Sequence, residues 1–318
     1  MPSRKLEFEN AHFLQSLFAG QAGLLKVVAR TFDLKVTTRD NWVKLESDDA
    51  ESIEKASELF RKLEDARRDG AEISEHSFRF ALDAVAQGEG EALKELMAYR
   101  LLGTSTKPPV VPKTRGQLTY LKAMDQNDVV FGVGPAGTGK TYLAMARSIA
   151  ALKNHEVNRL ILTRPAVEAG EALGFLPGDL KEKILPYLRP LYDALYDMLE
   201  PDEVEKMIER GMIEIAPLAY MRGRTLNHAA IVLDEAQNTT REQMFMFLTR
   251  LGAESRCVVT GDPSQVDLKQ PSGSGLHEAM RALEGTEGIE FVAFDKGDVV
   301  RHRVVRRIID AYAAHREK

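Results

Sequence analysis

The sequence predicts an α/β protein in which a doubly wound parallel sheet follows a small α+β domain. Six short apolar runs rich in β-branched residues recur after residue 113, and helical patterns lie between most of them. Such runs are typical of parallel strands that are buried on both faces. Helical crossovers between parallel strands are right-handed, which distributes the helices over both faces of one sheet. We expect the strands at 129–133, 160–162, 213–216, 231–233, 257–259 and 291–294.

The N-terminal region carries strand and helix patterns in another order. Two helical stretches flank the turn Gly20-Gln21-Ala22-Gly23, and two strand patterns meet at Asp40-Asn41, as in a hairpin. Helical spacing continues from Ser74 to Met97. The predicted order is strand, helix, helix, strand, strand, helix, at 6–8, 13–18, 24–32, 34–38, 42–45 and 50–68.

A proline-rich segment separates the two regions. Residues 103–112 contain three prolines among small polar residues, a composition that favours an extended linker. We therefore expect a first domain at 1–102, this linker at 103–112, and a second domain at 113–318. In the second domain, helices are expected at 140–152, 180–199, 202–210, 241–251 and 274–283.

The strand at 129–133 runs into a glycine-rich turn and then a helix. Its residues fit the spacing G-x-x-x-x-G-K-[ST], in which backbone N–H groups surround phosphates, the lysine reaches the β- and γ-phosphates and the hydroxyl binds Mg²⁺. A glycine-rich turn without a ligand is the alternative, which the strand before and the helix after disfavour. The predicted nucleotide-binding residues are Gly134, Pro135, Ala136, Gly137, Thr138, Gly139, Lys140 and Thr141.

Two further strands are predicted to end on polar side chains at the same edge of the sheet, where ligands of α/β proteins bind. The strand at 231–233 runs into Asp234 and Glu235, a Walker B pattern. Asp234 would hold Mg²⁺, directly or through water, with Thr141 as the other ligand, and Glu235 would polarise the attacking water. The strand at 257–259 runs into Gly261-Asp262-Pro263-Ser264-Gln265, where Gln265 is expected to sense a γ-phosphate. An ordinary turn is the alternative for this last segment.

Together with Arg164-Pro165 and the segment 298–302, these motifs resemble the PhoH-like ATPases and the first RecA-like domain of superfamily 1 helicases. The resemblance covers residues 113 to about 315. It implies a single RecA-like P-loop NTPase domain that uses ATP and Mg²⁺. It also implies that Gln117 reads the adenine, with Tyr120 able to stack on it, and that the segment 164–167 contacts nucleic acid.

The order of elements in the N-terminal region resembles a KH domain, whose GxxG loop clamps a few single-stranded nucleotides. The basic residue usual in that loop is missing, since Gln21 and Ala22 stand there. An RNA-binding surface and a plain break between two helices both remain open. Positive charge lies nearby at Lys26, Arg30, Lys35, Arg39 and Lys44.

Family members with such a domain are similar to bacterial cytoplasmic proteins of RNA metabolism, including ribosomal-RNA processing beside an endoribonuclease. A cytoplasmic protein without a membrane span also fits the residues. The chain has one cysteine, Cys257, and nowhere do 18 consecutive apolar residues occur. Its net charge of −5 predicts no global attraction to nucleic acid, so RNA binding would have to be local.

Superfamily 1 helicases close two RecA-like domains on ATP, whereas the residues after 112 suffice for about one. A neighbouring subunit would then supply an arginine finger, and cyclic symmetry would give every site one. We expect a homo-oligomeric ring, most simply a hexamer. Arg301 is the first candidate for the finger, followed by Arg222 and Arg224. Arginines that only line the surface or contact phosphates are the alternative.

The sequence therefore predicts a Mg²⁺-dependent ATPase that remodels or unwinds RNA, with single-stranded RNA as its partner. A second hypothesis is a nucleotide-gated RNA-binding adaptor with slow hydrolysis that recruits a partner such as an endoribonuclease. A small-molecule kinase is disfavoured, because the predicted strand ends position a water rather than a substrate hydroxyl.

Overall fold

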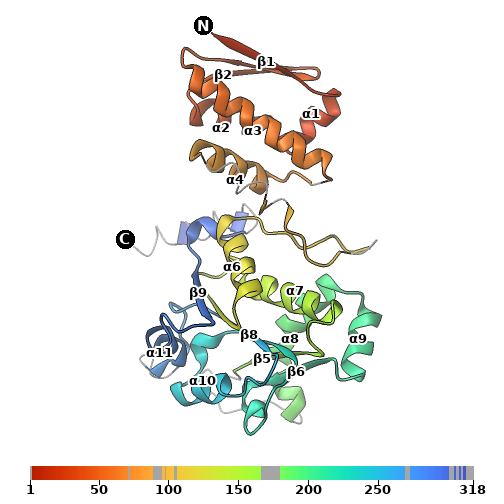
Figure 1. Cartoon of the computed structure of the whole chain (residues 1–318), viewed down its shortest axis with the longest axis vertical. Coiled ribbons are helices and arrows are strands. Elements are labelled where there is room, and N and C mark those ends of the chain that lie inside the picture. Colours follow the sequence, from red (N-terminus) through yellow and green to blue (C-terminus); the bar gives the residue numbers. More distant parts are fainter. Residues whose placement is uncertain are drawn as a thin grey trace. The chain divides into compact units, whose positions relative to one another are not determined.

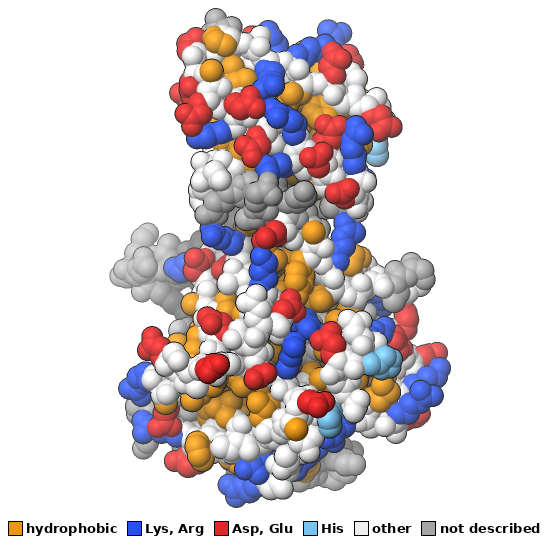
Figure 2. Space-filling view, viewed as in Figure 1, with side chains coloured by type: hydrophobic (Ala, Val, Ile, Leu, Met, Phe, Trp, Pro, Cys, Tyr) orange, Lys and Arg blue, Asp and Glu red, His pale blue; other side chains and the backbone are white. Residues whose placement is uncertain are grey.

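The computed structural model describes residues 2–70, 72–88, 95–96, 98–103, 106–165, 180–268, 273–300, 304–305, 308 and 311–312. The chain divides into two compact units (Figure 1). Unit one comprises Met1–Arg100 with Val111–Arg115, and unit two comprises Leu101–Val110 with Gly116–Lys318. Figure 2 shows basic and acidic side chains interspersed over the visible face of each unit. No helix in the described ranges combines the length and apolarity that crossing a membrane requires.

Unit one is built on a three-stranded antiparallel sheet in the order β1-β3-β2. The central strand β3 alternates between buried and half-buried residues, so Val43 and Leu45 face the helices. The strand, helix, helix, strand, strand, helix order is as predicted, whereas the kinship with KH domains remains a prediction. The elements are β1 (Ser3–Glu7), α1 (Ala11–Leu17), α2 (Ala22–Thr31), β2 (Lys35–Arg39), β3 (Trp42–Glu46), α3 (Ala50–Arg68) and α4 (Glu75–Ala86).

The turn between α1 and α2 depends on only one of its two glycines. Gly20 has a φ of +66°, a left-handed backbone that glycine adopts without strain. Gly23 lies inside the first turn of α2, and a β-carbon there would meet nothing within 4 Å. Neither helix geometry nor packing in unit one therefore requires glycine at position 23.

Unit two contains a six-stranded parallel sheet in the order β6-β5-β7-β8-β4-β9, which confirms the predicted architecture and all six strands. The strands β4 and β7 are buried along their whole length, as expected of inner strands of a doubly wound sheet. Strand β8 lies between these two. The strands are β4 (Val129–Val133), β5 (Arg159–Arg164), β6 (Ile213–Pro217), β7 (Ala229–Leu233), β8 (Arg256–Gly261) and β9 (Ile289–Ala293).

Helices cover both faces of this sheet (Figure 1). Alternate residues of β4, β7 and β8 form one apolar cluster with Met244 and Phe247 of α10 and Leu276 of α11. On the other face, α7 packs against β7 and β8, and α8 packs against β5 and β6. Five of these helices match the predicted ranges closely, whereas α6 was not predicted. The helices are α6 (Arg115–Gln126), α7 (Lys140–Lys153), α8 (Leu180–Met198), α9 (Pro201–Glu209), α10 (Arg241–Leu248) and α11 (Gly275–Ala282).

Most of the proline-rich segment groups with unit two, as part of Leu101–Val110, whereas Val111 and Pro112 group with unit one. Leu101 and Val110 exchange two backbone hydrogen bonds of 2.9 and 2.8 Å and so close this segment into a loop. The Lys107 ammonium donates to the Tyr196 carbonyl oxygen of α8 at 2.8 Å. Composition predicts the extended backbone here, but not these contacts.

Close packing of Tyr120 against the sheet generates a test of the fold. The Tyr120 ring is fully buried, lies edge-on to Phe294 and occupies the space over Gly132 of β4, where a β-carbon would come within 2.7 Å of the ring. We expect Gly132→Ala to lower the free energy of unfolding by about 1–3 kcal/mol, since an overfilled core must shift. Thermal and urea unfolding would measure the loss.

Gly273→Ala is the matched control, because a β-carbon at Gly273 meets nothing within 4 Å. Equal stability of the two variants would mean that Tyr120 does not occupy this position.

Candidate functional site

The phosphate loop joins β4 to α7 and depends on three glycines. Gly134, Gly137 and Gly139 have φ values of +142°, +87° and +85°, which other residues adopt only with strain. At Gly134 a β-carbon would also come within 2.4 Å of the Phe294 carbonyl oxygen. Helix α7 begins at Lys140, so the backbone N–H groups of its first turn face the loop. The loop is thus shaped for an anion at the start of a helix.

A cavity of about 290 Å³ opens beside this loop. The Lys140 ammonium donates to the carbonyl oxygens of Gly134 and Pro135 at 2.7 and 2.8 Å, which holds it within the loop. The Thr138 hydroxyl donates to Pro135 at 3.1 Å, so this buried side chain serves the shape of the loop. The cavity is lined by Ala136, Gly137, Gly139, Lys140, Thr141, Tyr142, Asp234, Glu235, Gly261, Asp262 and Gln265.

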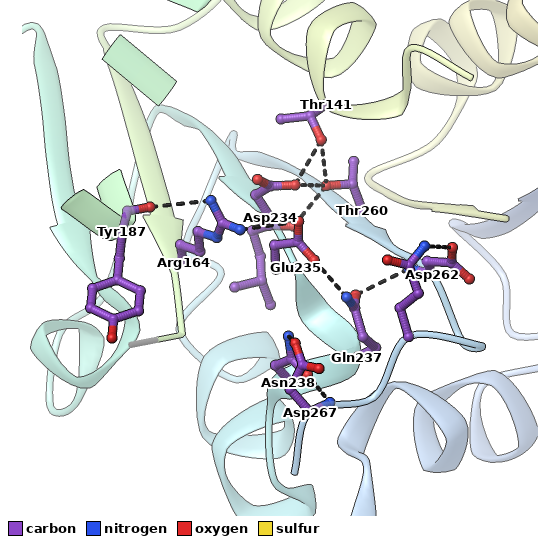
Figure 3. Close-up of polar contacts among 12 residues, drawn as sticks. Thr141, Arg164, Tyr187, Asp234, Glu235, Gln237, Asn238, Thr260, Asp262 and Asp267 are labelled. Atoms are coloured by element: carbon purple, nitrogen blue, oxygen red, sulfur yellow. Dashed lines mark hydrogen bonds and ion pairs between the residues drawn. The ribbon is translucent and has the colours of Figure 1, made fainter. Parts of the chain in front are cut away.

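The two predicted Mg²⁺ ligands lie together in the structure. The Thr141 hydroxyl donates to Asp234 Oδ1 at 2.7 Å, and the Thr260 hydroxyl of β8 donates to the same oxygen at 2.8 Å (Figure 3). Neighbouring ligands of an octahedral Mg²⁺ at 2.0–2.1 Å lie about 3 Å apart. The oxygens of Thr141 and Asp234 therefore fit adjacent positions of one Mg²⁺ shell. Sequence reasoning missed Thr260, whose position as the last residue before Gly261 is its only local signal.

Glu235 lines the same cavity but is held by neighbours on its other side. Its Oε1 forms an ion pair with Arg164 Nη2, 3.1 Å away, and its Oε2 accepts from Gln237 Nε2 at 2.5 Å (Figure 3). Arg164 also donates from Nη1 to the Tyr187 carbonyl oxygen at 3.2 Å. The backbone of Glu235 is left-handed, with φ +54° and ψ +40°, an uncommon conformation for a residue with a β-carbon. Backbone and side chain together fix where this carboxylate points.

Gln237 joins the end of β7 to the loop after β8. Its Oε1 accepts from the Asp262 backbone N–H at 3.0 Å, while its Nε2 holds Glu235. Asp262 in turn accepts from the Ser264 N–H and hydroxyl at 3.0 and 2.7 Å, and from Gln265 Nε2 at 2.6 Å. The sequence motif included Gln237 without giving it this role, which depends on contact between two separate loops.

The Asp262 carboxyl is a stable anion next to the cavity. Burial raises its pKa, but the hydrogen bonds from Ser264 and Gln265 and the charge of Lys140 outweigh burial and lower the pKa below its ordinary value. Gln265, the predicted γ-phosphate sensor, lines the cavity with its amide bound to Asp262.

The structure separates the two residues expected at the adenine. Gln117 of α6 is buried and donates from Nε2 to the Thr138 carbonyl oxygen at 2.8 Å, so it contacts the phosphate loop directly. Its reading of adenine remains a prediction. Tyr120 lies in the core against Phe294 and offers no open face to a base, which contradicts the suggestion that it stacks there.

The candidate fingers differ in their surroundings. Arg301 lies outside the described residues, but the Val300 N–H immediately before it donates to the Gly137 carbonyl oxygen at 2.9 Å, beside the phosphate loop. Arg224 holds Glu214 of β6 through two hydrogen bonds of 2.6 and 2.8 Å, and this pairing lowers the pKa of Glu214. Arg224 thus has a partner within its own chain, and its role as a finger remains a prediction. Arg222 is exposed, and positions 166 and 167 of the predicted nucleic-acid segment are outside the described residues.

The sequence of this chain matches known proteins over most of its length. A family model described as PhoH-like protein matches residues 109–313. The chain is 50% identical over 297 residues to a PhoH-like protein of Bacillus subtilis, covering 93% of each chain. It is 42% identical over 249 residues to the protein PhoH of Escherichia coli K12, covering 78% of this chain and 69% of that one.

Among solved structures, the SWI2/SNF2 ATPase core of Sulfolobus solfataricus in complex with double-stranded DNA aligns with a TM-score of 0.34 at 15% identity. That alignment covers 58% of this chain and 46% of the other. The large terminase of a thermophilic bacteriophage aligns with a TM-score of 0.36 at 12% identity, covering 61% of this chain and 49% of that one.

The contacts of Asp234 predict the effect of one substitution. Thr260→Val keeps the shape of the side chain but removes a donor from a buried carboxylate. A hydrogen bond to a charged group stabilises a protein by roughly 1.5–3 kcal/mol, so a loss of about that size in the free energy of unfolding is expected. Urea unfolding without nucleotide would measure it.

Thr225→Val, at an exposed position of the same unit, is the control and should change stability by less than about 0.5 kcal/mol. A Thr260→Val protein as stable as this control would show that Thr260 does not support Asp234.

Proposed function

The chain belongs to the PhoH-like family, and from this premise we propose that it is a Mg²⁺-dependent ATPase that acts on RNA in the cytoplasm. Family membership supports a P-loop protein that binds and hydrolyses a nucleotide. The observation that carries the finer proposal is the meeting of Thr141 with Asp234 at the start of α7, with Lys140 and Glu235 on the same cavity.

ATP binding uses the loop between β4 and α7. Backbone N–H groups at the start of α7 hold the phosphates, and Lys140 exchanges its carbonyl partners for phosphate oxygens. Thr141 and Asp234 would hold Mg²⁺, which when bound would supply positive charge beside the phosphate oxygens. Thr260 orients Asp234 throughout.

The other cavity residues have separate roles in the proposed hydrolysis of ATP. Glu235 takes the proton of the attacking water, because it lines the same cavity as the phosphate-loop residues. Gln265 contacts the γ-phosphate, and Asp262 holds the Gln265 amide in place. Gln117 supports the loop at Thr138 and reads the adenine in this proposal.

The proposed RNA contacts are basic side chains of unit one. In unit one, Lys26 and Arg30 are exposed four residues apart on α2, and so lie on one helix face after the Gly20–Gly23 turn. Lys35 and Lys44 share Glu46 as an ion-pair partner, which reduces their contribution. We therefore propose that single-stranded RNA contacts the face of α2 that carries Lys26 and Arg30 rather than the strands.

The second hypothesis, an RNA-binding adaptor with slow hydrolysis that recruits a partner such as an endoribonuclease, is favoured by one observation. Both carboxylate oxygens of Glu235 already have partners, Arg164 and Gln237. ATP hydrolysis is expected to be slow while the general base is occupied in this way. The two hypotheses differ in whether RNA raises the rate.

Steady-state ATP hydrolysis with and without single-stranded RNA tests the function. We expect Lys140→Ala to abolish tight ATP binding, and Glu235→Gln to retain binding while reducing turnover at least about 100-fold, because the general base is lost. Strong stimulation of the wild type by RNA supports the ATPase that acts on RNA, whereas RNA binding without stimulation supports the adaptor.

Glu242→Gln makes the same chemical change at an exposed position of α10 and should leave the rate unchanged. Normal hydrolysis by Glu235→Gln would reject Glu235 as the base.

The active form is proposed to be a ring, most simply a hexamer, with Arg301 of one subunit reaching the site of the next. An arginine finger raises turnover about 10³-fold or more, so specific activity should rise with protein concentration. Arg301→Ala and Glu235→Gln should each be nearly inactive, and mixing them should restore activity at interfaces that keep both groups. Light scattering would report the assembly state.

Arg222→Ala replaces the remaining exposed candidate and is the comparison variant. A fully active monomer, or no recovery in the mixture, would reject the finger in trans.

A further inference from the structure

We propose that Arg164 is a positioning residue that restrains the base Glu235 until a backbone phosphate of RNA takes its guanidinium. This inference rests on the proposed function, since it concerns how RNA and hydrolysis are connected. It begins from the ion pair between Arg164 Nη2 and Glu235 Oε1, 3.1 Å apart. The guanidinium occupies Oε1, one of the two carboxylate oxygens through which Glu235 could accept a proton from water.

The pair is placed where another anion can compete for the arginine. The side chains of Arg164 and Glu235 are 20% and 36% exposed, so solvent screens their attraction and leaves it modest. Arg164 is otherwise anchored through Nη1 on the Tyr187 carbonyl oxygen. Its planar fork of N–H donors matches the oxygens of a phosphate better than it matches one carboxylate oxygen and one carbonyl.

The strand order indicates which phosphate this is. The P-loop follows β4, whereas Arg164 ends β5, and β8 and β7 lie between them. Three strand spacings of about 4.8 Å put these two strands roughly 14 Å apart. Glu235 lines the nucleotide cavity, but Arg164 is not among its described lining residues. A phosphate that draws Arg164 away therefore approaches from the β5 side of the sheet, and an RNA backbone supplies phosphates there.

Release of Arg164 would free one oxygen of Glu235 and leave the other in place. Gln237 keeps its hold on Oε2 at 2.5 Å and is itself fixed by the Asp262 N–H. The left-handed backbone of Glu235 likewise stays as it is. The carboxylate thus stays aimed at the cavity while Oε1 becomes free to accept a proton from water. In this way RNA binding at β5 raises the rate at the P-loop.

Competition for one arginine predicts a coupling that RNA binding alone can measure. Wild type, Glu235→Gln, Arg164→Gln and the double variant would be titrated without nucleotide against a fluorescent 15-nucleotide oligouridylate. Glu235→Gln removes the competitor and should tighten RNA binding about 3- to 10-fold. Arg164→Gln should weaken binding, and in that background Glu235→Gln should have no further effect.

Arg159→Gln is the matched control, since Arg159 lies at the opposite end of the same strand and should leave RNA affinity and basal turnover unchanged. Equal tightening by Glu235→Gln with and without Arg164 would be a general charge effect and would overturn the proposal. The absence of RNA binding by the wild type would also overturn the proposal. A coupling between Arg164 and Glu235 that appears in the affinity for ATPγS, and not in the affinity for RNA, would overturn it as well, because the competing anion would then be the nucleotide.

ATP hydrolysis by the full chain provides the second measurement. Arg164→Gln should raise turnover without RNA and reduce the stimulation by RNA to near one-fold, and Arg164→Lys should lie between, because one ammonium cannot hold both partners in the same fork. A lower basal rate with unchanged stimulation would mean that Arg164 supports Glu235 instead of restraining it. If the wild type hydrolyses no ATP, the proposed function fails, while the binding cycle still decides this inference.

Discussion

The Asp234 carboxylate is buried at the end of β7, and a buried charge is tolerated only where donors compensate its lost hydration. Two hydroxyls from separate elements meet this need, Thr141 at the start of α7 and Thr260 at the end of β8. Their shared acceptor fixes the helix after the P-loop against two strands of the sheet. This group of oxygens is therefore a property of the packing of three elements, α7, β7 and β8.

Local patterns were sufficient for much of this architecture. The strands were predicted because both of their faces are buried, so a parallel sheet leaves an uninterrupted apolar run in the sequence. The phosphate loop was predicted because its glycines meet a backbone requirement, which is visible at Gly134, Gly137 and Gly139 as positive φ. In both cases the pattern that predicts the structure lies within a few consecutive residues. Burial of a strand and positive φ in a loop are constraints on those same residues.

What the sequence did not reveal depends on contacts between distant segments. Helix α6 was missed because its buried face includes Gln117 and Tyr120, whose polar groups suggested ligand contacts rather than a core. Thr260 and Gln237 acquire their roles only once β8 lies beside β7, and Arg164 acquires its role only once β5 lies on the other side. The pairing of Arg224, a candidate finger, with Glu214 of β6 likewise has no signal in the sequence.

Glu235 is the point at which these long-range contacts converge. Its backbone conformation is uncommon, and such strain persists only where the surroundings impose it. Here the surroundings are Arg164 from β5 and Gln237, whose other end is bound to the loop after β8. A displacement at the end of β5 can reach the P-loop cavity through this carboxylate, whereas the loop after β8 lines the cavity directly with Asp262 and Gln265. Because the sheet core beneath is rigid and closely packed, such a displacement is taken up by the polar side chains above it rather than by the strands. The polar side chains at the strand ends therefore link the end of β5, through Glu235 and Gln237, to the loop after β8 and the cavity beside the P-loop.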